Sequence, residues 1–189
     1  MSAVRDLYEE LQLRGALQSG HFLLSSGRHS DRFVQKFRIL EDPQMVEPIA
    51  GKIARHFEAA DPTIVISAAV GGIILGYEVA RALGTKAIFV EKEGGRPVLR
   101  RDFALTSNDR ALVVEDVMTT GQSVRETMQF ARDRGAGVIG VGAIVRRAPV
   151  DLGVEIYALL DLPIQSHSAQ ECPQCKAGVP LSDPGSRRR

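Results

Sequence analysis

The chain has 189 residues, with 24 Lys and Arg against 23 Asp and Glu, so its formal net charge is +1. Hydrophobic residues make up 44% and charged residues 25%, a balance typical of a folded globular protein rather than a disordered one. The near-zero charge argues against a protein that binds nucleic acid or membranes through a strongly basic surface. A single domain is expected from this length.

Neither the first residues nor the longest apolar run indicates export or membrane insertion. Residues 1–15 mix charged side chains with leucines, unlike the apolar core of a signal peptide. The run from Ala68 to Tyr77 contains two adjacent glycines, and it is well short of the about 20 residues of a membrane helix. The two cysteines, Cys172 and Cys175, are too few for a disulfide framework. We therefore predict a cytoplasmic protein.

The first third of the chain predicts a helix, a hairpin and a second helix. Val4, Leu7 and Leu11 recur at helical spacing, and Gly15 supplies a stop. Two extended runs, residues 22–24 and 33–37, flank a polar turn and predict a hairpin. Asp42-Pro43 then begins a helix, with Asp as the cap and Pro in the first turn, and its buried stripe is Val46, Ile49, Ile53 and Phe57.

Short apolar runs rich in β-branched residues alternate with helical stretches in the rest of the chain. They predict strands at 63–66, 87–90, 111–114 and 138–145, and helices after Gly72 and Gly121. Continuously apolar strands separated by helices are typical of a parallel sheet that is covered on both faces. We predict an α/β fold whose ligand binds at the carboxyl ends of the strands.

The strand at 111–114 is followed by Glu115 and Asp116 and then by a turn with two Thr, Gly121 and Ser123. A glycine turn with hydroxyls at a helix N-terminus favours a phosphate monoester. The two carboxylates suit sugar hydroxyls, or a hydrated Mg²⁺ held through water. Together these groups predict a ribose 5-phosphate site. The alternative is an ordinary capped turn with Thr119 or Thr120 as the N-cap.

Residues 115–123 resemble the signature of type I phosphoribosyltransferases. Residues 22–30 are similar to the hood segment that covers the base in the orotate-specific members of that family, and residues 142–147 are similar to their base-binding strand end. The resemblance implies a central, mostly parallel sheet flanked by helices, with a small N-terminal hood. It implies one domain over 1–189, with the hood at about 1–40, the core at about 41–165 and a tail at about 166–189.

The resemblance also implies roles for individual residues. Glu115 and Asp116, catalytic together with Lys92, hold the ribose hydroxyls of phosphoribosyl pyrophosphate, and Lys92 meets its pyrophosphate. Arg96 is added to the pyrophosphate site by inference and not by the resemblance. Thr119 and Arg147 contact orotate; for Arg147 the alternative is a surface side chain beside Arg146. The 5-phosphate is wrapped by Val117, Met118, Thr119, Thr120, Gly121, Gln122 and Ser123.

The implied activity is transfer of the phosphoribosyl group to orotate, giving orotidine 5'-monophosphate and pyrophosphate in pyrimidine biosynthesis. Mg²⁺ is the implied cofactor, held by substrate and water near Glu115 and Asp116 without a direct protein ligand. The implied partners are the two small substrates and a second copy in a homodimer, with no nucleic acid and no membrane. The alternatives are a purine-type transferase and a non-catalytic sensor of phosphoribosyl pyrophosphate.

Two segments depart from the family pattern. The turn at residues 67–72 lacks the aromatic residue and the Lys of commoner members. In the loop at 91–101, predicted to be flexible at Gly94-Gly95, Lys92 matches the family Lys, but a further Lys and His are missing. Arg96, Arg100 and Arg101 are the candidate replacements, and the alternative for each is a solvated hairpin position.

His167, Cys172 and Cys175 invite a zinc site, because Cys-x-x-Cys is a common half-site. A closed structural zinc site needs four ligands, and three stand together here. The favoured interpretation is a terminal turn without zinc, and the alternative is a site shared between subunits.

Overall fold

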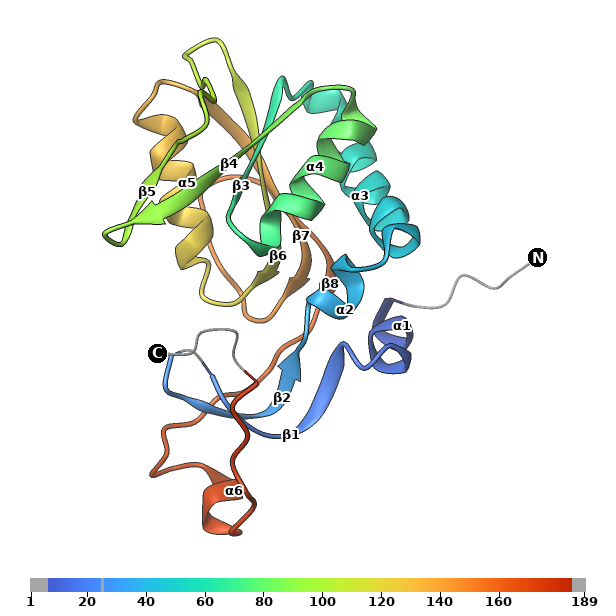
Figure 1. Cartoon of the computed structure of the whole chain (residues 1–189), viewed down its shortest axis with the longest axis vertical. Helices are drawn as coiled ribbons and strands as arrows, with labels where there is room; N and C mark the ends of the chain where they lie inside the picture. Colours follow the sequence, from blue (N-terminus) through green and yellow to red (C-terminus); the bar gives the residue numbers. More distant parts are fainter. Residues whose placement is uncertain (1–6, 25, 185–189) are drawn as a thin grey trace, which may run out of the picture. The chain divides into compact units, whose positions relative to one another are not determined.

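The computed structural model describes residues 7–24 and 26–184. The chain forms two compact units (Figure 1). We call Leu40–Leu162 the sheet unit, and the described residues up to Ile39 together with those from Pro163 onward the hairpin unit. The elements in chain order are α1 (Leu7–Leu13), β1 (Leu17–Leu23), β2 (His29–Val34), α2 (Phe37–Leu40), α3 (Pro43–Phe57), η1 (Glu58–Ala60), β3 (Ile64–Ala68), α4 (Gly71–Leu83), β4 (Lys86–Glu93), β5 (Arg96–Val98), β6 (Arg110–Met118), α5 (Gln122–Arg132), β7 (Gly137–Arg146), β8 (Ile156–Asp161) and α6 (Pro173–Lys176).

The sheet unit contains a six-stranded sheet in the order β5-β4-β3-β6-β7-β8. All neighbouring strands are parallel except β4 and β5, which form an antiparallel pair at one edge. The chain leaves β3 towards β4 on one side and later returns to β6 on the other. The strand order therefore reverses between β3 and β6, which is where open α/β sheets bind their ligands.

Helices cover both faces of this sheet, with α5 on one face and α3 and α4 on the other (Figure 1). On the α5 face, Val124 and Met128 pack in one apolar cluster with strand residues that include Ile66 and Val141. On the other face, Gly140 lets the Phe57 ring of α3 approach β7 closely, because an added Cβ there would overlap it. The predicted α/β fold with a mostly parallel, doubly covered sheet is therefore confirmed.

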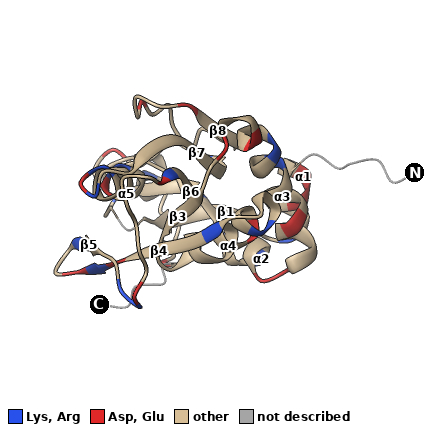
Figure 2. Ribbon diagram, turned by 90° about the horizontal axis from the view of Figure 1, so that it is seen from above, with Lys and Arg blue, Asp and Glu red and all other residues tan. Residues whose placement is uncertain are grey.

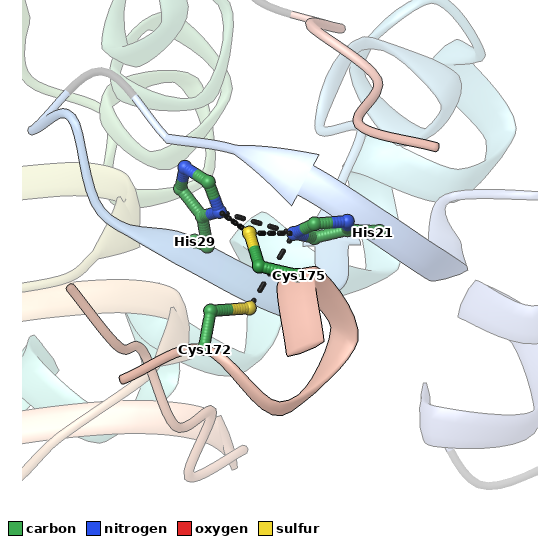
Figure 3. A group of neighbouring side chains, drawn as sticks. All are labelled: His21, His29, Cys172 and Cys175. Atoms are coloured by element: carbon green, nitrogen blue, oxygen red, sulfur yellow. Dashed lines mark hydrogen bonds between the residues drawn. The ribbon is translucent and has the colours of Figure 1, made fainter. Parts of the chain in front are cut away.

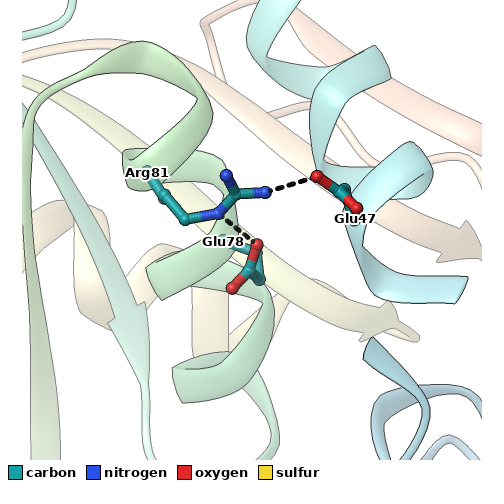
Figure 4. A network of polar contacts seen from close by, with 3 residues as sticks. All are labelled: Glu47, Glu78 and Arg81. Carbon is teal, nitrogen blue, oxygen red and sulfur yellow. Dashed lines mark hydrogen bonds and ion pairs between the residues drawn. The ribbon is translucent and has the colours of Figure 1, made fainter. Parts of the chain in front are cut away.

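The start of α3 and its contact with α4 are built from polar groups. Asp42 caps α3 by accepting a hydrogen bond from the backbone N–H of Gln44 at 3.0 Å, and Pro43 follows it, as predicted. Arg81 of α4 reaches Glu78 at 2.8 Å and Glu47 of α3 at 2.9 Å (Figure 4). The hydrogen bond to Glu78, followed by that to Glu47, raises the pKa of Arg81. All three side chains are exposed enough that this network orients the helices more than it stabilises them.

Three predicted boundaries need correction. The strand predicted at 111–114 continues to Met118, because pairing with β7 runs on through Val117 and Val145. The loop at 91–101 is not irregular at its start: β4 and β5 pair across Gly94-Gly95, where positive φ angles of 56° and 80° form the tight turn. Strand β8 was missed, since its sequence Ile-Tyr-Ala-Leu-Leu-Asp carries no flanking signal as strong as those of the other strands.

The hairpin unit is built on β1 and β2, which pair antiparallel. The predicted hairpin is confirmed, but β1 starts at Leu17, and the predicted second strand ends at Val34, before Phe37 enters α2. Helix α1 ends before Gly15, whose φ is +64°, as predicted; Val4 lies outside the described residues. In the part of the chain that the structure describes, no helix is long and apolar enough to cross a membrane.

Candidate active site

The predicted acidic pair lies inside β6 rather than in the turn after it. Glu115 and Asp116 are 9% and 1% exposed. The backbone N–H of Asp116 donates to the Glu115 carboxylate at 3.2 Å, and that of Val117 donates to Asp116 Oδ1 at 2.6 Å. Carboxylates lose much hydration when they are buried to this extent. The strand end therefore holds two acceptor groups in fixed positions beside the switch point.

The turn from β6 into α5 exposes its hydroxyl groups. Thr119 and Thr120 are exposed, and Gly121 adopts a φ of +74° as the N-cap of α5. An added Cβ at Gly121 would lie 2.7 Å from Val150 Cγ1, so a larger residue would disturb the turn. Because the cap is a glycine, the alternative in which Thr119 or Thr120 is the N-cap is wrong. The backbone N–H of Gln122 donates to Thr120 Oγ1 at 3.4 Å. The exposed threonines and the N-terminus of α5 form a turn of the kind that suits an anion.

Arg125, which sequence analysis missed, holds this turn in shape. Its guanidinium donates to the carbonyl oxygens of Thr120 and Asp151, both at 2.8 Å. The turn is thereby connected to the segment that follows β7. An Arg one turn into the helix after a glycine turn was the available signal in the sequence.

The β3–α4 turn borders the same switch point. Gly72, at the start of α4, is so close to β3 and β6 that an added Cβ would lie 3.0 Å from Ser67 Cβ and 3.4 Å from the Val114 carbonyl oxygen. Ala69 N–H donates to the Val90 carbonyl at 2.8 Å, which fixes the turn to β4. Small residues therefore give the backbone close access to whatever lies between the two turns.

Two neighbouring arginines at the end of β7 have different surroundings. Arg146 makes a two-pronged ion pair with Asp161 of β8, at 2.5 and 2.8 Å. Arg147 is bound through its backbone N–H to the Met118 carbonyl at 2.8 Å, next to the β6–α5 turn. Its Nε is buried, and within residues 7–24 and 26–184 no hydrogen-bond partner reaches it. Burial lowers the pKa of this guanidinium, because the charged form loses hydration.

A buried guanidinium nitrogen without a partner is costly, and an anionic ligand would offset that cost. Arg147 is thus partly buried, with its Nε enclosed, whereas Arg146 has Asp161 as a partner of its own.

The cations of the β4–β5 hairpin are mostly paired within the protein. Lys92 Nζ lies 2.5 Å from Glu126 Oε2 of α5, Arg100 pairs with Glu93 at 2.9 Å, and Arg101 pairs with Glu91. The Lys92 hydrogen bond lowers the pKa of Glu126, and a hydrogen bond from Gln122 contributes in the same direction. Figure 2 shows acidic and basic segments side by side on this hairpin. Exposed pairs of this kind are weak and can exchange for a more highly charged ligand.

Arg96 differs from the other hairpin cations: it is exposed, and no ion pair joins it to another described residue. Lys92 contacts the first turns of α5 and so lies near the hydroxyl-rich turn. Of the candidates to replace the missing Lys and His, Arg96 is thus the one whose guanidinium has no carboxylate partner within the described part of the chain.

Most of the predicted site residues therefore meet at one edge of the sheet. Glu115 to Ser123 form a continuous strand end, turn and helix start, and Arg147 is hydrogen-bonded to it. The predicted hood segment, residues 22–30, belongs to the hairpin unit, and Ser25 of that segment lies outside the described residues.

The sequence of the sheet unit matches a known family. Residues 37–154 match the model of the phosphoribosyl transferase domain, a range that includes β3 to β7, both glycine turns and Arg147. The chain therefore belongs to the phosphoribosyl transferase family.

Relatives that match nearly the whole chain narrow this further. An orotate phosphoribosyltransferase of Pelotomaculum thermopropionicum is 47% identical over 179 residues, covering 94% of this chain and 94% of the relative. One of Caldanaerobacter subterraneus is 44% identical over 187 residues, covering 98% and 97%. The crystal structure of orotate phosphoribosyltransferase from Aeropyrum pernix has a TM-score of 0.70 and 27% identity, covering 82% of this chain and 93% of that one. Within the family, the chain groups with the orotate phosphoribosyltransferases.

Proposed function

We propose that this protein transfers the 5-phosphoribosyl group from phosphoribosyl pyrophosphate to orotate, giving orotidine 5'-monophosphate and pyrophosphate, a step of pyrimidine biosynthesis. The observation that carries the proposal is the position of Arg147. Its backbone N–H is hydrogen-bonded to Met118 at the end of β6, and the buried Nε of its guanidinium has no hydrogen-bond partner among the described residues. Its planar donors match the carboxylate of orotate, which adenine and hypoxanthine lack.

The reaction is a displacement at the anomeric carbon of the ribose. The bond from this carbon to a ring nitrogen of orotate forms, and that nitrogen releases its proton to solvent. The bond from the carbon to the pyrophosphate oxygen breaks and leaves the electron pair on pyrophosphate. Glu115 and Asp116 accept hydrogen bonds from the ribose hydroxyls, and the turn at 117–123 binds the 5-phosphate with backbone N–H groups and hydroxyls. Positioning and charge neutralisation supply the acceleration, so no covalent nucleophile is needed.

The β4–β5 hairpin supplies the cations for the leaving group. Lys92 exchanges its ion pair with Glu126 for the pyrophosphate, which carries more negative charge than one carboxylate. Arg96, exposed and without an ion-pair partner in the described ranges, is the second cation of this part of the site. This assignment is supported by the surface exposure of the Lys92 side chain, 47%, which makes its present pair easy to exchange.

Mg²⁺ is part of the proposal, because the residues at the strand end fit it. Glu115 and Asp116 offer hard carboxylate oxygens, the donors that Mg²⁺ prefers, and they would hold it through water and substrate. Bound there with pyrophosphate, Mg²⁺ would neutralise negative charge on the leaving group.

A homodimer and a cytoplasmic location complete the proposal. Val70, which precedes α4, and Ile74 and Tyr77 of α4 are 70%, 40% and 63% exposed and recur at helical spacing, a stripe that a second copy would cover. Two free cysteines agree with a reducing compartment. We also propose that the hairpin and sheet units serve one activity, as a hood and a core with a C-terminal tail.

The test is a comparison of acceptor bases with purified protein, Mg²⁺ and phosphoribosyl pyrophosphate. We expect orotate to be consumed with formation of orotidine 5'-monophosphate, and no turnover of adenine, hypoxanthine or uracil. Turnover of a purine without orotate would favour the purine-type transferase. Binding of phosphoribosyl pyrophosphate without turnover of any base would favour the sensor.

A further inference from the structure

Four side chains of the hairpin unit converge on one point, and none of them has a role in the proposed transfer reaction. They are His21 of β1, His29 of β2, and Cys172 and Cys175 at the start and within α6 (Figure 3). Each offers one ligand atom, and these four atoms all lie within 4.8 Å of one another. His21, His29 and Cys172 are buried, at 3%, 6% and 1% exposure. We propose that these residues form a structural zinc site of the Cys₂His₂ type.

The distances between the ligand atoms match the edges of a zinc tetrahedron. With Zn–N of about 2.05 Å and Zn–S of about 2.3 Å, the edges are about 3.3 Å for N–N, 3.6 Å for N–S and 3.8 Å for S–S. His21 Nε2 lies 3.0 Å from His29 Nδ1 and 3.4 and 3.7 Å from the sulfurs of Cys172 and Cys175. The Cys175 sulfur lies 3.2 Å from His29 Nδ1. These four edges are within about 0.4 Å of the ideal lengths, and the other two lie within 4.8 Å.

His21 is already fixed in the tautomer that a metal requires. Its Nδ1 lies 2.8 Å from the carbonyl oxygen of Val179, which can only accept, so Nδ1 carries the proton. Nε2 then presents its lone pair to the other three ligand atoms. A carbonyl that orients a ligating imidazole in this way is a recurrent feature of protein zinc sites.

A β-bulge turns His21 towards the cluster. Between the pairs Ser19–Arg32 and Phe22–Ser30, β1 advances by three residues and β2 by two, so β1 contains one extra residue. Gly20 leaves room for the Phe22 ring, because an added Cβ there would lie 2.9 Å from the ring's Cζ. As a result His21 and Phe22 are buried in succession, where a regular strand would alternate.

The local fold brings the two cysteines to this position. The C-terminal segment pairs with the hairpin through His29 and His167 and through Phe22 and Ser182. His167, the ligand suggested by the sequence, takes part through its backbone, and His21 and His29 provide the missing imidazoles. The count of three ligands made from the sequence was therefore wrong.

The chemistry of the donor set selects the metal. Two thiolates and two neutral imidazoles around Zn²⁺ have no net charge, which suits a buried position. Sulfur and imidazole donors in a tetrahedron favour Zn²⁺ over Mg²⁺ or Ca²⁺, which take oxygen ligands. A two-stranded hairpin is marginal by itself, and a metal that joins it to a segment more than a hundred residues away along the chain would stabilise it.

Zinc content of the full-length chain, expressed without a polyhistidine tag and purified under reducing conditions, tests this proposal. We expect about one zinc per chain in the wild type and at least about tenfold less in Cys172→Ser and in His21→Gln. His167→Gln, a matched histidine outside the cluster, retains the wild-type content. A wild type without zinc after incubation with zinc chloride, or a Cys172→Ser variant with the wild-type content, overturns the proposal.

A second measurement covers the case in which the variants do not fold. In the wild type, Co²⁺ exchanged for the metal should give the absorption bands of tetrahedral thiolate coordination, and added zinc chloride should abolish them. A spectrum of octahedral Co²⁺, or none, overturns the proposal. Neither measurement uses a substrate, so neither depends on the proposed transferase activity.

Discussion

The sheet unit and the hairpin unit each gather polar side chains, but the groups face different targets. In the hairpin unit, the ligand atoms of His21, His29, Cys172 and Cys175 face one another, and four of their pairwise distances are 3.0 to 3.7 Å. In the sheet unit, Thr119 is exposed, and Arg147 Nε has no hydrogen-bond partner within the described residues. Groups that converge on one another bind a small ion and stabilise the fold, whereas groups that face outward around a turn await a larger ligand. Changes in the first set should cost stability, and changes in the second should cost activity.

The largest effect is expected from the acidic pair. Replacing Glu115 by Gln and Asp116 by Asn together should lower kcat/KM by about 10³-fold, because two charged acceptors for the ribose are lost. Steady-state kinetics measures the loss, and the melting temperature should stay close to that of the wild type. Glu58→Gln, an exposed change in η1, serves as the control with normal kinetics. Wild-type kinetics in the double variant would remove the ribose role.

Lys92→Ala should lower kcat by about 10²-fold, since one cation that neutralises the leaving group is lost. Its exposed ion pair with Glu126 predicts little loss of stability. Lys86→Ala, at the opposite end of the same strand, is the matched control and should leave kcat unchanged. Equal kcat values in the two variants would show that the β4–β5 hairpin is only a solvated edge of the sheet.

Metal removal, unlike the two substitutions above, should lower the stability of the protein. Stripping the wild-type chain with a chelator should reduce the melting temperature by about 4–8 °C, equivalent to roughly 2 kcal/mol. Calorimetry of His29→Gln should show no further shift on chelation, because that variant already lacks the metal. A chelator shift of equal size in His29→Gln would assign the effect to another cause.

The smallest effect concerns Arg146 and Asp161. The hydrogen bond from Arg146 lowers the pKa of Asp161, so the pair stabilises the fold above the unfolded-state pKa of about 3.9, and this contribution is lost as the pH falls through the folded value. Because Asp161 is 57% exposed, Asp161→Asn should cost less than about 1 kcal/mol at pH 7. Urea unfolding should show this difference shrinking to nothing in strong acid. A difference that persists there would point to packing instead.

The two regions also differ in how far the sequence predicts them. The β6–α5 site lies in one continuous run, so Glu115 to Ser123 could be assigned from residue types and from the family resemblance. The length of β6 could not, because it depends on pairing with β7 as far as Met118. The ion pairs of Lys92, Arg100 and Arg101 depend on the β4–β5 register, which only the turn at Gly94-Gly95 indicates.

The full set of four zinc ligands could not be identified from the sequence, for a physical reason. Its ligands come from three segments, and no spacing rule relates His21 and His29 to Cys172 and Cys175. The bulge at Gly20 sets the direction of His21, and the pairing of His29 with His167 sets the position of the C-terminal segment. Cys-x-x-Cys was the part of the signal that the sequence contained.

The most direct test of the contrast between inward-facing and outward-facing groups compares the two neighbouring arginines. Arg147→Ala should raise the KM for orotate by about 10- to 150-fold, since a charged hydrogen-bond donor to substrate is worth about 1.5–3 kcal/mol. Arg146→Ala, which removes a guanidinium that already has Asp161 as its partner, should leave that KM within about twofold of the wild type. Equal KM values in the two variants would contradict the assignment of Arg147 to the substrate.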